Sequence, residues 1–269
     1  MIIVYLLAGL SKRFGGKPKG LARIGPNNET LLEYSIKQAL PINPTKLIFV
    51  VSNQTKELFA KEFKNSYKGI PIKYALQEFD SKIRDKPWGT CDALCSASSF
   101  IDSPFILCNG DDIYGERSFK ILAEHIKNKE ESATLGYELG KVLSDKGDVN
   151  RGIFQTDKNG FVKSIVEVLN LNKSNLKERG LKEESLCSMN IFAFSESVLS
   201  YFKEILADFK KEHANDRTAE CFLPNSATLL IKSNKLKMKV YPTQDKWIGL
   251  TRPEDEEEAR NELKTINHI

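Results

Sequence analysis

A loop rich in glycine and in cationic residues follows the first apolar segment of the chain. Residues 9–20 read Gly-Leu-Ser-Lys-Arg-Phe-Gly-Gly-Lys-Pro-Lys-Gly and contain four glycines and four cations. Glycine lets backbone N–H groups approach an anion closely, while Arg and Lys supply charge to phosphate oxygens. The composition therefore indicates a polyphosphate site, and the alternative is a basic surface loop without a ligand.

The spacing within this loop excludes two common phosphate motifs. A Walker A motif requires G-x-x-x-x-G-K-[ST], but Ser11 stands where the first glycine should be and Pro18 follows Lys17. A dinucleotide fingerprint of the form G-x-G-x-x-G fails because Ser11 also replaces its second glycine. If the loop binds phosphate, it does so in another way.

Two adjacent carboxylates follow a second apolar segment. The predicted strand Pro104–Cys108 ends in Asn109-Gly110-Asp111-Asp112. Ligands of open α/β sheets bind beyond the carboxyl ends of strands, and Mg²⁺ prefers carboxylate oxygens. Asp111 is therefore a candidate Mg²⁺ ligand with Asp112 behind it, and the alternative is an aspartate that caps its own turn.

Short apolar runs alternate with helix-period segments in the first half, which predicts an α/β fold with a parallel sheet. The predicted strands are Ile2–Ala8, Lys46–Val51, Ile72–Leu76, Pro104–Cys108, Ile153–Gln155, Phe161–Val168, Leu186–Phe194 and Leu236–Tyr241. The predicted helices are Thr30–Gln38, Lys56–Phe63, Gly89–Phe100, Glu196–Lys211 and Glu254–Leu263. The polar segment Asn170–Glu184 is helix-prone and is predicted to be solvated.

Composition and charge exclude several classes of protein. Lys and Arg total 40 against 36 Asp and Glu, and the net charge of +4 is scattered along the chain, so we expect no nucleic-acid partner. Five cysteines and three dispersed histidines offer neither a disulfide framework nor a His-rich metal centre. The longest uncharged stretch, Met1–Ser11, is too short to span a bilayer. We therefore expect a cytoplasmic protein with no membrane partner.

Five blocks, in order along nearly the whole chain, resemble the nucleotidylyltransferase (NTP-transferase) superfamily, which includes sugar-phosphate pyrophosphorylases and small cytidylyltransferases. The blocks are Leu7-Ala8-Gly9-x-Ser11-x-Arg13 with Pro18-Lys19, Gln77 with Gly89-Thr90-x-Asp92-Ala93-Leu94, Asn109 to Gly115, Ser188 to Phe194, and Trp247 to Asp255. The resemblance implies a Rossmann-like three-layer sandwich with a mostly parallel mixed central sheet and a small acceptor-binding β subregion. It also implies a single domain over residues 1–269, with a nucleotide-binding half at 1–115 and an acceptor-binding half at 116–269, and no fused acetyltransferase or repeat domain.

The resemblance assigns roles to individual residues. The catalytic cations would be Arg13, on the β- and γ-phosphates, and Lys19, on the α-phosphate. The nucleotide would be bound by Leu7, Ala8, Gly9, Ser11, Lys17, Gln77, Gly89, Thr90, Asn109 and Gly110, with Lys17 the alternative to Lys19. The phosphorylated acceptor would be bound by Asp112, Arg151, Glu167 and Asn190, with Lys163 a second candidate cation. Mg²⁺ would be held by Asp111 and Thr251.

Three positions depart from the family pattern. Val168 follows Glu167, where relatives carry a lysine. Thr251, or Gly249 in another alignment, stands where relatives carry a second Asp or Asn metal ligand. Phe192 is bulkier than the usual glycine, so we expect it to reshape the acceptor pocket.

Three functions remain open at the level of the sequence. The first is a nucleotidylyltransferase that moves an NMP unit from an NTP, with UTP or CTP favoured, to a phosphorylated sugar for surface-glycan precursors. The second is a cytidylyltransferase for a non-sugar phosphate, such as an amino-acid or polyol phosphate, or phosphocholine. For phosphocholine, Trp88, Tyr114, Phe192 and Trp247 could supply an aromatic cage. The third is a non-catalytic nucleotidyltransferase-like subunit. A homodimer is the commonest oligomeric state of soluble proteins and stays the open expectation.

Overall fold

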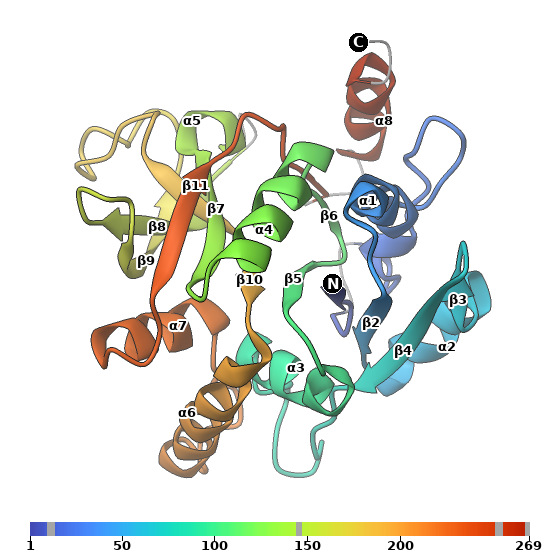
Figure 1. The fold of residues 1–269 in the computed structure, drawn as a ribbon, viewed down its shortest axis with the longest axis horizontal. Helices are drawn as coiled ribbons and strands as arrows, with labels where there is room; N and C mark the ends of the chain where they lie inside the picture. Colours follow the sequence, from blue (N-terminus) through green and yellow to red (C-terminus); the bar gives the residue numbers. More distant parts are fainter. Residues whose placement is uncertain (10–13, 144–146, 251–254, 267–269) are drawn as a thin grey trace.

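The computed structural model describes residues 1–9, 14–143, 147–250 and 255–266, and its centre is a mixed β-sheet (Figure 1). The sheet has the strand order β11-β7-β10-β5-β1-β2-β4-β3, and β8 and β9 extend it beside β10. Its strands are β1 (Ile2–Leu6), β2 (Lys46–Val51), β3 (Ser66–Tyr67), β4 (Ile70–Leu76), β5 (Phe105–Asn109), β7 (Ser132–Glu138), β8 (Val149–Thr156), β9 (Val162–Leu171), β10 (Leu186–Phe194) and β11 (Met238–Pro242). A separate antiparallel pair is formed by β6 (Asp112–Ile113) and β12 (Ile248–Gly249).

The central strands run parallel, and one strand in the second half runs against them. β1 pairs in parallel with β2 and β5, and β2 pairs in parallel with β4. β10 is antiparallel to both β5 and β7, while β11 is parallel to β7. The carboxyl ends of β1, β2, β4 and β5 therefore lie at one edge of the sheet, where ligands of open α/β sheets bind.

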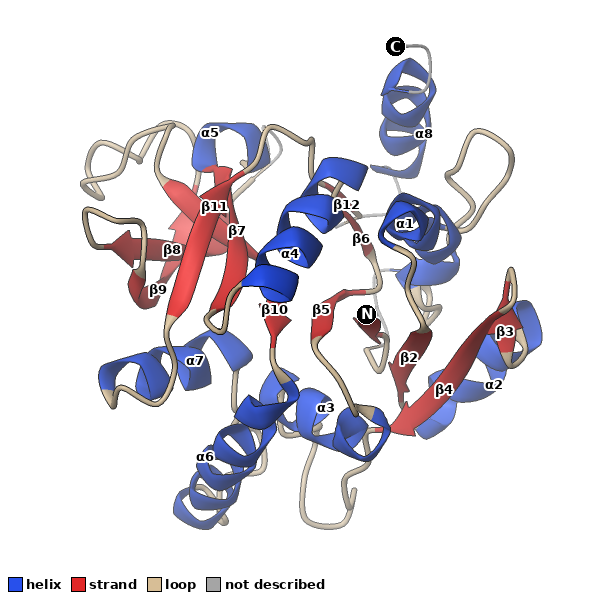
Figure 2. Cartoon of the chain, viewed as in Figure 1, coloured by secondary structure: helices blue, strands red, loops and turns tan. Residues whose placement is uncertain are grey.

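Helices cover both faces of the sheet (Figure 2). They are α1 (Leu31–Ala39), α2 (Asn53–Phe63), α3 (Thr90–Ala97), α4 (Glu116–Asn128), α5 (Leu139–Val142), α6 (Leu199–Glu212), α7 (Leu223–Lys232) and α8 (Asp255–Ile266), with single 3-10 turns at Lys19–Leu21, Leu40–Ile42, Ser98–Phe100 and Glu196–Val198. In β1, Ile3 and Tyr5 pack with α1, α2 and α4, while Ile2 and Val4 pack with α3, α6 and α7. Both faces of the strand are buried, which explains its unbroken apolar sequence. The predicted three-layer α/β fold is confirmed.

Most predicted elements are present, with ends shifted by a few residues. The segment Asn170–Glu184 is mainly exposed, as predicted, but its helix-prone sequence continues β9 and then forms turns. The side chain of Asn172 accepts hydrogen bonds from the backbone N–H groups of Ser174 and Asn175 at 3.0 and 3.1 Å. Such local capture of backbone donors competes with helix formation. The helices α4 and α7 and the strand β7 were not predicted, nor were the short elements α5, β3, β6 and β12.

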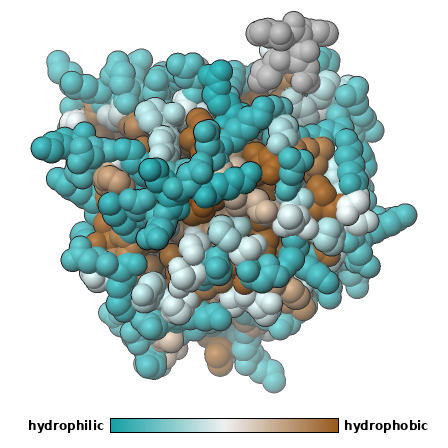
Figure 3. Space-filling view, in the orientation of Figure 1, coloured by the Kyte–Doolittle hydropathy of each residue, from teal (hydrophilic) through white to brown (hydrophobic). Residues whose placement is uncertain are grey.

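The outer surface is mainly hydrophilic on the face shown in Figure 3, with smaller apolar areas between the charged side chains. Within the described ranges, no helix combines the length and apolar character needed to cross a membrane.

The helix α8 is held near α1 by a small apolar cluster that includes Leu31, Tyr34, Ala259 and Leu263.

A buried carboxylate orders the turn before α1. Glu29 is 4% exposed and accepts hydrogen bonds from Lys37 Nζ at 2.6 Å and from the Asn27 backbone N–H at 2.7 Å. Burial acts to raise the pKa of Glu29, but the hydrogen bonds from Lys37 and from the turn outweigh it and lower the pKa to about 2. The ionised form therefore stabilises the folded chain.

We expect Glu29→Gln to lower the free energy of unfolding at pH 7 by about 2 kcal/mol, the usual size of a lost charged hydrogen-bond set. Because the folded pKa lies below the unfolded value, the wild-type advantage is full above pH 4.5 and is lost as the pH falls towards 2. Urea unfolding at pH 7 and at pH 3 measures this difference, with the exposed Glu57→Gln as control. An equal loss at both pH values would contradict the interpretation.

Candidate active site

The loops that follow β1 and β5 touch each other closely at the carboxyl edge of the sheet. The two strands are hydrogen-bonded neighbours with Leu6 opposite Asn109, and Gly110 N donates to Leu6 O at 2.9 Å. A methyl group on Gly20 would lie 2.8 Å from the carbonyl oxygen of Gly110. A residue with a side chain at position 20 would therefore push the loops apart. Glycine here allows the contact that brings the two predicted charge-bearing segments together.

This contact places a cation next to a carboxylate. Lys19 Nζ lies 3.5 Å from Asp111 Oδ2, and the two side chains are 24% and 37% exposed. Because both remain accessible, the pair contributes little stability of its own. The pair matters because of its position: a phosphate group can reach Lys19 there, and a cation can reach Asp111.

A cavity of about 250 Å³ opens beside this pair. Its lining comes from β5, β6, β8, β9, β10 and β12, from the start of α7, and from the turn at Lys19–Leu21. Seven predicted site residues line it: Lys19, Asn109, Asp111, Asp112, Arg151, Glu167 and Asn190. Residues that are far apart in the sequence, and predicted for two different substrates, therefore share one cavity.

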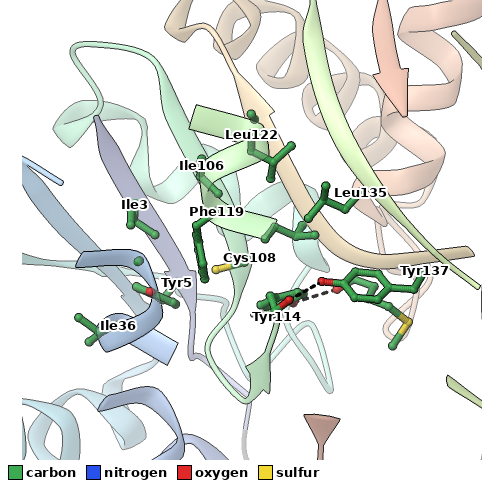
Figure 4. Packing of buried hydrophobic residues seen from close by; sticks show 14 of the residues in the cluster. Ile3, Tyr5, Ile36, Ile106, Cys108, Tyr114, Phe119, Leu122, Leu135 and Tyr137 are labelled. Atoms are coloured by element: carbon green, nitrogen blue, oxygen red, sulfur yellow. Dashed lines mark hydrogen bonds between the residues drawn. The ribbon is translucent and has the colours of Figure 1, made fainter. Parts of the chain in front are cut away.

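Asp112 forms the buried floor of the cavity beside the exposed Asp111. Asn109 Nδ2 donates to Asp112 Oδ2 at 2.9 Å, and the Tyr114 hydroxyl lies 3.2 Å from the same oxygen. Tyr114 also donates to Met189 O at 2.8 Å and, through its own carbonyl, accepts from the Tyr137 hydroxyl (Figure 4). Burial and the negative charge of Asp111 raise the pKa of Asp112 to about 7, against the opposing effect of its hydrogen bonds.

Gly249 lets the closing segment of the chain pack over Asp112. A methyl group at position 249 would lie 2.3 Å from the Trp247 ring and 2.6 Å from Asp112 Oδ1. The pairing of β12 with β6 sets Gly249 opposite Asp112. The Trp247 ring consequently forms one wall of the cavity.

A cation and a carboxylate face the cavity from the β8–β9 pair. Arg151 and Glu167 lie one residue apart in the register, because Gly152 pairs with Glu167. Arg151 donates to Asn150 O at 3.1 Å and to Val142 O at 2.9 Å, and its guanidinium lies 5.4 Å from the centre of the Trp247 ring. Burial lowers the pKa of Arg151, and burial raises the pKa of Glu167, partly offset by the charge of Arg151. Lys163 is exposed and does not line the cavity.

Asn190 reaches the cavity from an irregular point in β10. Its φ is +57°, and the pairing of β10 with β7 shifts register between Ser188 and Phe192. Asparagine tolerates this left-handed conformation better than most residues, and such bulges often lie beside functional sites. The expectation that Phe192 reshapes the pocket is wrong, because its ring is fully buried and stacks on Phe194.

The residues predicted to hold the base form a separate group at the ends of β4 and α3. Gln77 Nε2 donates to Gly89 O and to Asp92 Oδ2, both at 2.9 Å. Gly89 has a φ of +91°, and a Cβ there would lie 2.7 Å from Cys221 O. On this side of Gly89, the backbone of Cys221 therefore occupies the position that we predicted for a base. Thr90 Oγ1 accepts a hydrogen bond from the backbone N–H of Leu223 at 2.8 Å, which ties α3 to the start of α7.

The glycine-rich loop is described only in part. Leu7 is buried, Ala8 is half-buried, and Gly9 is exposed, with no atom within 4 Å of the point that a methyl group would occupy. Lys17 is exposed and does not line the cavity, in contrast to Lys19. Ser11, Arg13 and Thr251 lie outside the described residues, so their predicted roles stay predictions.

The four aromatic residues considered for a choline cage do not form one. Tyr114 and Phe192 are fully buried, and Trp88 stacks against the Arg84 guanidinium at 3.3 Å. Of the four, Trp247 alone lines the cavity, and Arg151 already faces it. The residues Asn150, Gly152, Ser188 and Pro224 also line the cavity and were missed. Of these four, only Ser188 carried a signal in the sequence, because it lies two residues before Asn190 in a predicted strand and such residues share a face.

The arrangement thus defines an α/β protein with an anion-compatible cavity at the carboxyl edge of its parallel strands. A family model described as nucleotidyl transferase matches residues 16–228, which is well over half of the sequence. The chain belongs to the nucleotidyl transferase family, and it is therefore an enzyme of the nucleotidyltransferase class.

Two individual relatives match large parts of the chain. The chain is 26% identical over 185 residues to the UTP–glucose-1-phosphate uridylyltransferase AglF of Haloferax volcanii. The aligned region covers 67% of this chain and 70% of AglF. It is 31% identical over 188 residues to the bifunctional protein GlmU of Buchnera aphidicola subsp. Acyrthosiphon pisum. This aligned region covers 62% of this chain and 36% of GlmU.

Two solved structures share the fold over nearly the whole chain. A glucose-1-phosphate thymidylyltransferase structure from Bacillus anthracis has a TM-score of 0.70 at 14% identity and covers 98% of this chain and 96% of its own. A UDP-glucose pyrophosphorylase complexed with UDP-glucose has a TM-score of 0.68 at 17% identity and covers 98% of each chain.

The contact between the two loops can be tested with two glycines of the same loop. We expect Gly20→Ala to lower the free energy of unfolding by about 1–3 kcal/mol, because the new methyl group meets the Gly110 carbonyl. Gly9→Ala should change it by less than about 1 kcal/mol, since no atom lies within 4 Å. Urea unfolding measures both, and equal effects of the two substitutions would contradict the proposed packing.

Proposed function

We propose that the protein transfers a nucleoside monophosphate unit from an NTP, with UTP or CTP favoured, to the phosphate of a phosphorylated sugar, and releases pyrophosphate. The observation that carries the proposal is the shared cavity, in which Lys19 and Asp111 lie together with Arg151, Glu167 and Asn190. In this proposal, residues 1–115 of a single domain bind the nucleotide and residues 116–269 bind the acceptor. The product would serve as an activated sugar for surface glycans.

The reaction is an in-line displacement at the α-phosphorus of the NTP. An oxygen of the acceptor phosphate forms the new P–O bond, and the bond to pyrophosphate breaks. The acceptor phosphate is mostly ionised at neutral pH, because its second pKa is near 6, so no general base is required. The described lining of the cavity, which includes no histidine, fits this requirement. The protein therefore has to position the two substrates and to stabilise the negative charge that develops during the transfer.

Two cations of the glycine-rich loop would stabilise the negative charge of the transferring group. Lys19 extends into the cavity and would bind the α-phosphate as charge builds on it. Arg13 would bind the β- and γ-phosphates. Gln77, Gly89 and Thr90 would contact the base from the group beside α3.

The donor set fits Mg²⁺ as the divalent ion. Asp111 offers a partly exposed carboxylate at the cavity. Mg²⁺ is commonly held by one or two carboxylates together with substrate phosphates and water. Asp111, with Thr251 as a second ligand, would hold the ion, which would neutralise phosphate charge during transfer.

The far side of the cavity would hold the acceptor. Glu167 and Asn190 suit sugar hydroxyl groups, and Arg151 suits an anionic group. Asp112 would contact the acceptor from the floor between them. The name of AglF, a uridylyltransferase for glucose 1-phosphate, supports a sugar phosphate as acceptor and UTP as one donor.

A pyrophosphate-release screen of four NTPs against phosphorylated sugars, polyols, amino acids and amines tests the proposal. We expect turnover with a sugar phosphate in the presence of Mg²⁺. Lys19→Ala and Asp111→Ala should each lower kcat/KM by at least about 100-fold, the usual loss when a preorganised charge is removed. Lys56→Ala is the control, because this exposed lysine on α2 does not line the cavity, and it should retain most of the activity.

Three results would contradict the proposal. Near wild-type rates in both the Lys19 and the Asp111 variants would remove the site, and no pyrophosphate with any pair would favour a non-catalytic subunit. Turnover confined to a polyol or amino-acid phosphate would replace the sugar with a different acceptor.

A further inference from the structure

Two buried N–H groups belong to residues that line the cavity and have no hydrogen-bond partner. They are Nε of Arg151, on β8, and Nε1 of Trp247, just before β12. The Arg151 guanidinium lies 5.4 Å from the centre of the Trp247 ring, so the two groups are neighbours. Within the described part of the chain, the other buried side-chain atoms without a partner are the hydroxyl oxygens of Tyr5 and Ser35, and neither residue lines the cavity.

Burial makes such donors costly to keep. A buried N–H group without an acceptor loses its hydrogen bonds to water and gains none in return, and folded proteins rarely retain such groups. Arg151 and Trp247 come from segments almost one hundred residues apart, so no local turn forces both to be unpaired. Their meeting at one cavity indicates that a ligand supplies the missing acceptors.

The guanidinium of Arg151 is fixed in place and keeps its charge. Its two terminal nitrogens donate to Val142 O at 2.9 Å and to Asn150 O at 3.1 Å. Both of these partners are neutral carbonyl groups, so the positive charge is left for a ligand. Burial lowers the pKa of Arg151, and the negative charges of Asp112 and Glu167 act in the opposite direction.

This pair of donors is set apart from the proposed transfer site by Asp112. The charges of Asp111 and Lys19 act on the pKa of Asp112, and the charge of Asp112 acts in turn on the pKa of Arg151. In the proposed reaction the reacting phosphate has to reach Lys19 and Asp111. The Arg151–Trp247 pair therefore faces a different part of the acceptor.

The chemistry of the two donors determines which ligand group fits them. Arginine and the indole N–H can only donate hydrogen bonds, so the ligand group has to accept. A hydroxyl group could satisfy one donor but would leave the positive charge without a partner. A carboxylate offers two accepting oxygens and a negative charge, and it matches the planar guanidinium.

We propose that Arg151 and Trp247 form a carboxylate subsite, so that the preferred acceptor is a phosphorylated sugar acid and not a neutral sugar phosphate. The proposal rests on the proposed function, in which this cavity holds the acceptor. Glu167 and Asn190, which line the same cavity, would bind the hydroxyl groups between the two anionic ends of the molecule.

The test compares acceptors that differ only in one carboxylate, with the nucleotide found in the pyrophosphate screen. The pairs are glucuronate 1-phosphate with glucose 1-phosphate, and galacturonate 1-phosphate with galactose 1-phosphate. We expect kcat/KM for at least one acid to exceed that for its neutral partner by about tenfold or more, because the neutral sugar leaves buried donors unpaired. Equal turnover within both pairs, or turnover confined to neutral sugar phosphates, would overturn the proposal.

Variants of the two donors test their role directly. Trp247→Phe removes the indole N–H but keeps an aromatic ring, and Arg151→Met removes the charge. Each should lower the acid-to-neutral ratio of kcat/KM about tenfold, whereas Arg151→Lys should keep part of the preference because the charge remains. Arg117→Met is the matched control, since this exposed arginine on α4 does not line the cavity. An equal loss for both members of a pair would assign the donors to the reacting phosphate and overturn the proposal.

Isothermal titration gives a second measurement that does not require turnover. The wild-type protein should bind the better acid more tightly than its neutral partner, and Trp247→Phe should weaken binding of the acid about tenfold. Thermal melting establishes that each variant is folded. If Arg151→Met does not fold because it loses its bonds to two carbonyl groups, Arg151→Lys and Trp247→Phe still decide the question.

The outcomes separate this inference from the proposed function. If the wild-type enzyme releases no pyrophosphate with any acceptor, the proposed function fails, and with it the inference. An active enzyme that binds and turns over the acid and the neutral sugar phosphate equally well contradicts only the inference.

Discussion

The close contact between the loop after β1 and the loop after β5 is the constraint on which the site depends. Parallel pairing sends both strands to the same edge, and Gly20 allows the first loop to rest against the Gly110 carbonyl. Only this approach brings Lys19 within 3.5 Å of Asp111. The two charges that the proposed chemistry requires are thus positioned by backbone packing, while their own ion pair is too exposed to hold them.

The second half of the molecule completes the cavity by reversing one strand. β10 runs antiparallel beside β5, and its first residues pair with β8, which in turn pairs with β9, so both strands reach the carboxyl edge of the sheet. Arg151 and Glu167 reach the cavity from these strands, and Asn190 reaches it from the irregularity in β10. Burial raises the pKa of Glu167 and lowers that of Arg151, so the cavity holds partly desolvated charges whose interactions with a ligand are strengthened.

The group around Gln77 shows a different use of burial. Its amide is held by a carbonyl and by a carboxylate that Lys210 supports from α6. The orientation of this glutamine in the first half of the chain therefore depends on a helix from the second half. Such long-range support fixes the position of a flexible side chain.

The sequence by itself determined the α/β class, most of the strands, and the residue types of the site. Unbroken apolar runs such as Ile2–Leu6 occur because both faces of these strands are buried, and the sequence marked the two charged segments that contain Lys19 and Asp111, which line one cavity in the structure. The tertiary structure alone decided which side chains meet. Phe192 turned into the core because a register shift changes the face on which a strand residue lies, and no local pattern marks that shift. The support of Asp92 by Lys210 and the contact of Gly89 with Cys221 were also hidden, because these partners come from elements far away in the sequence.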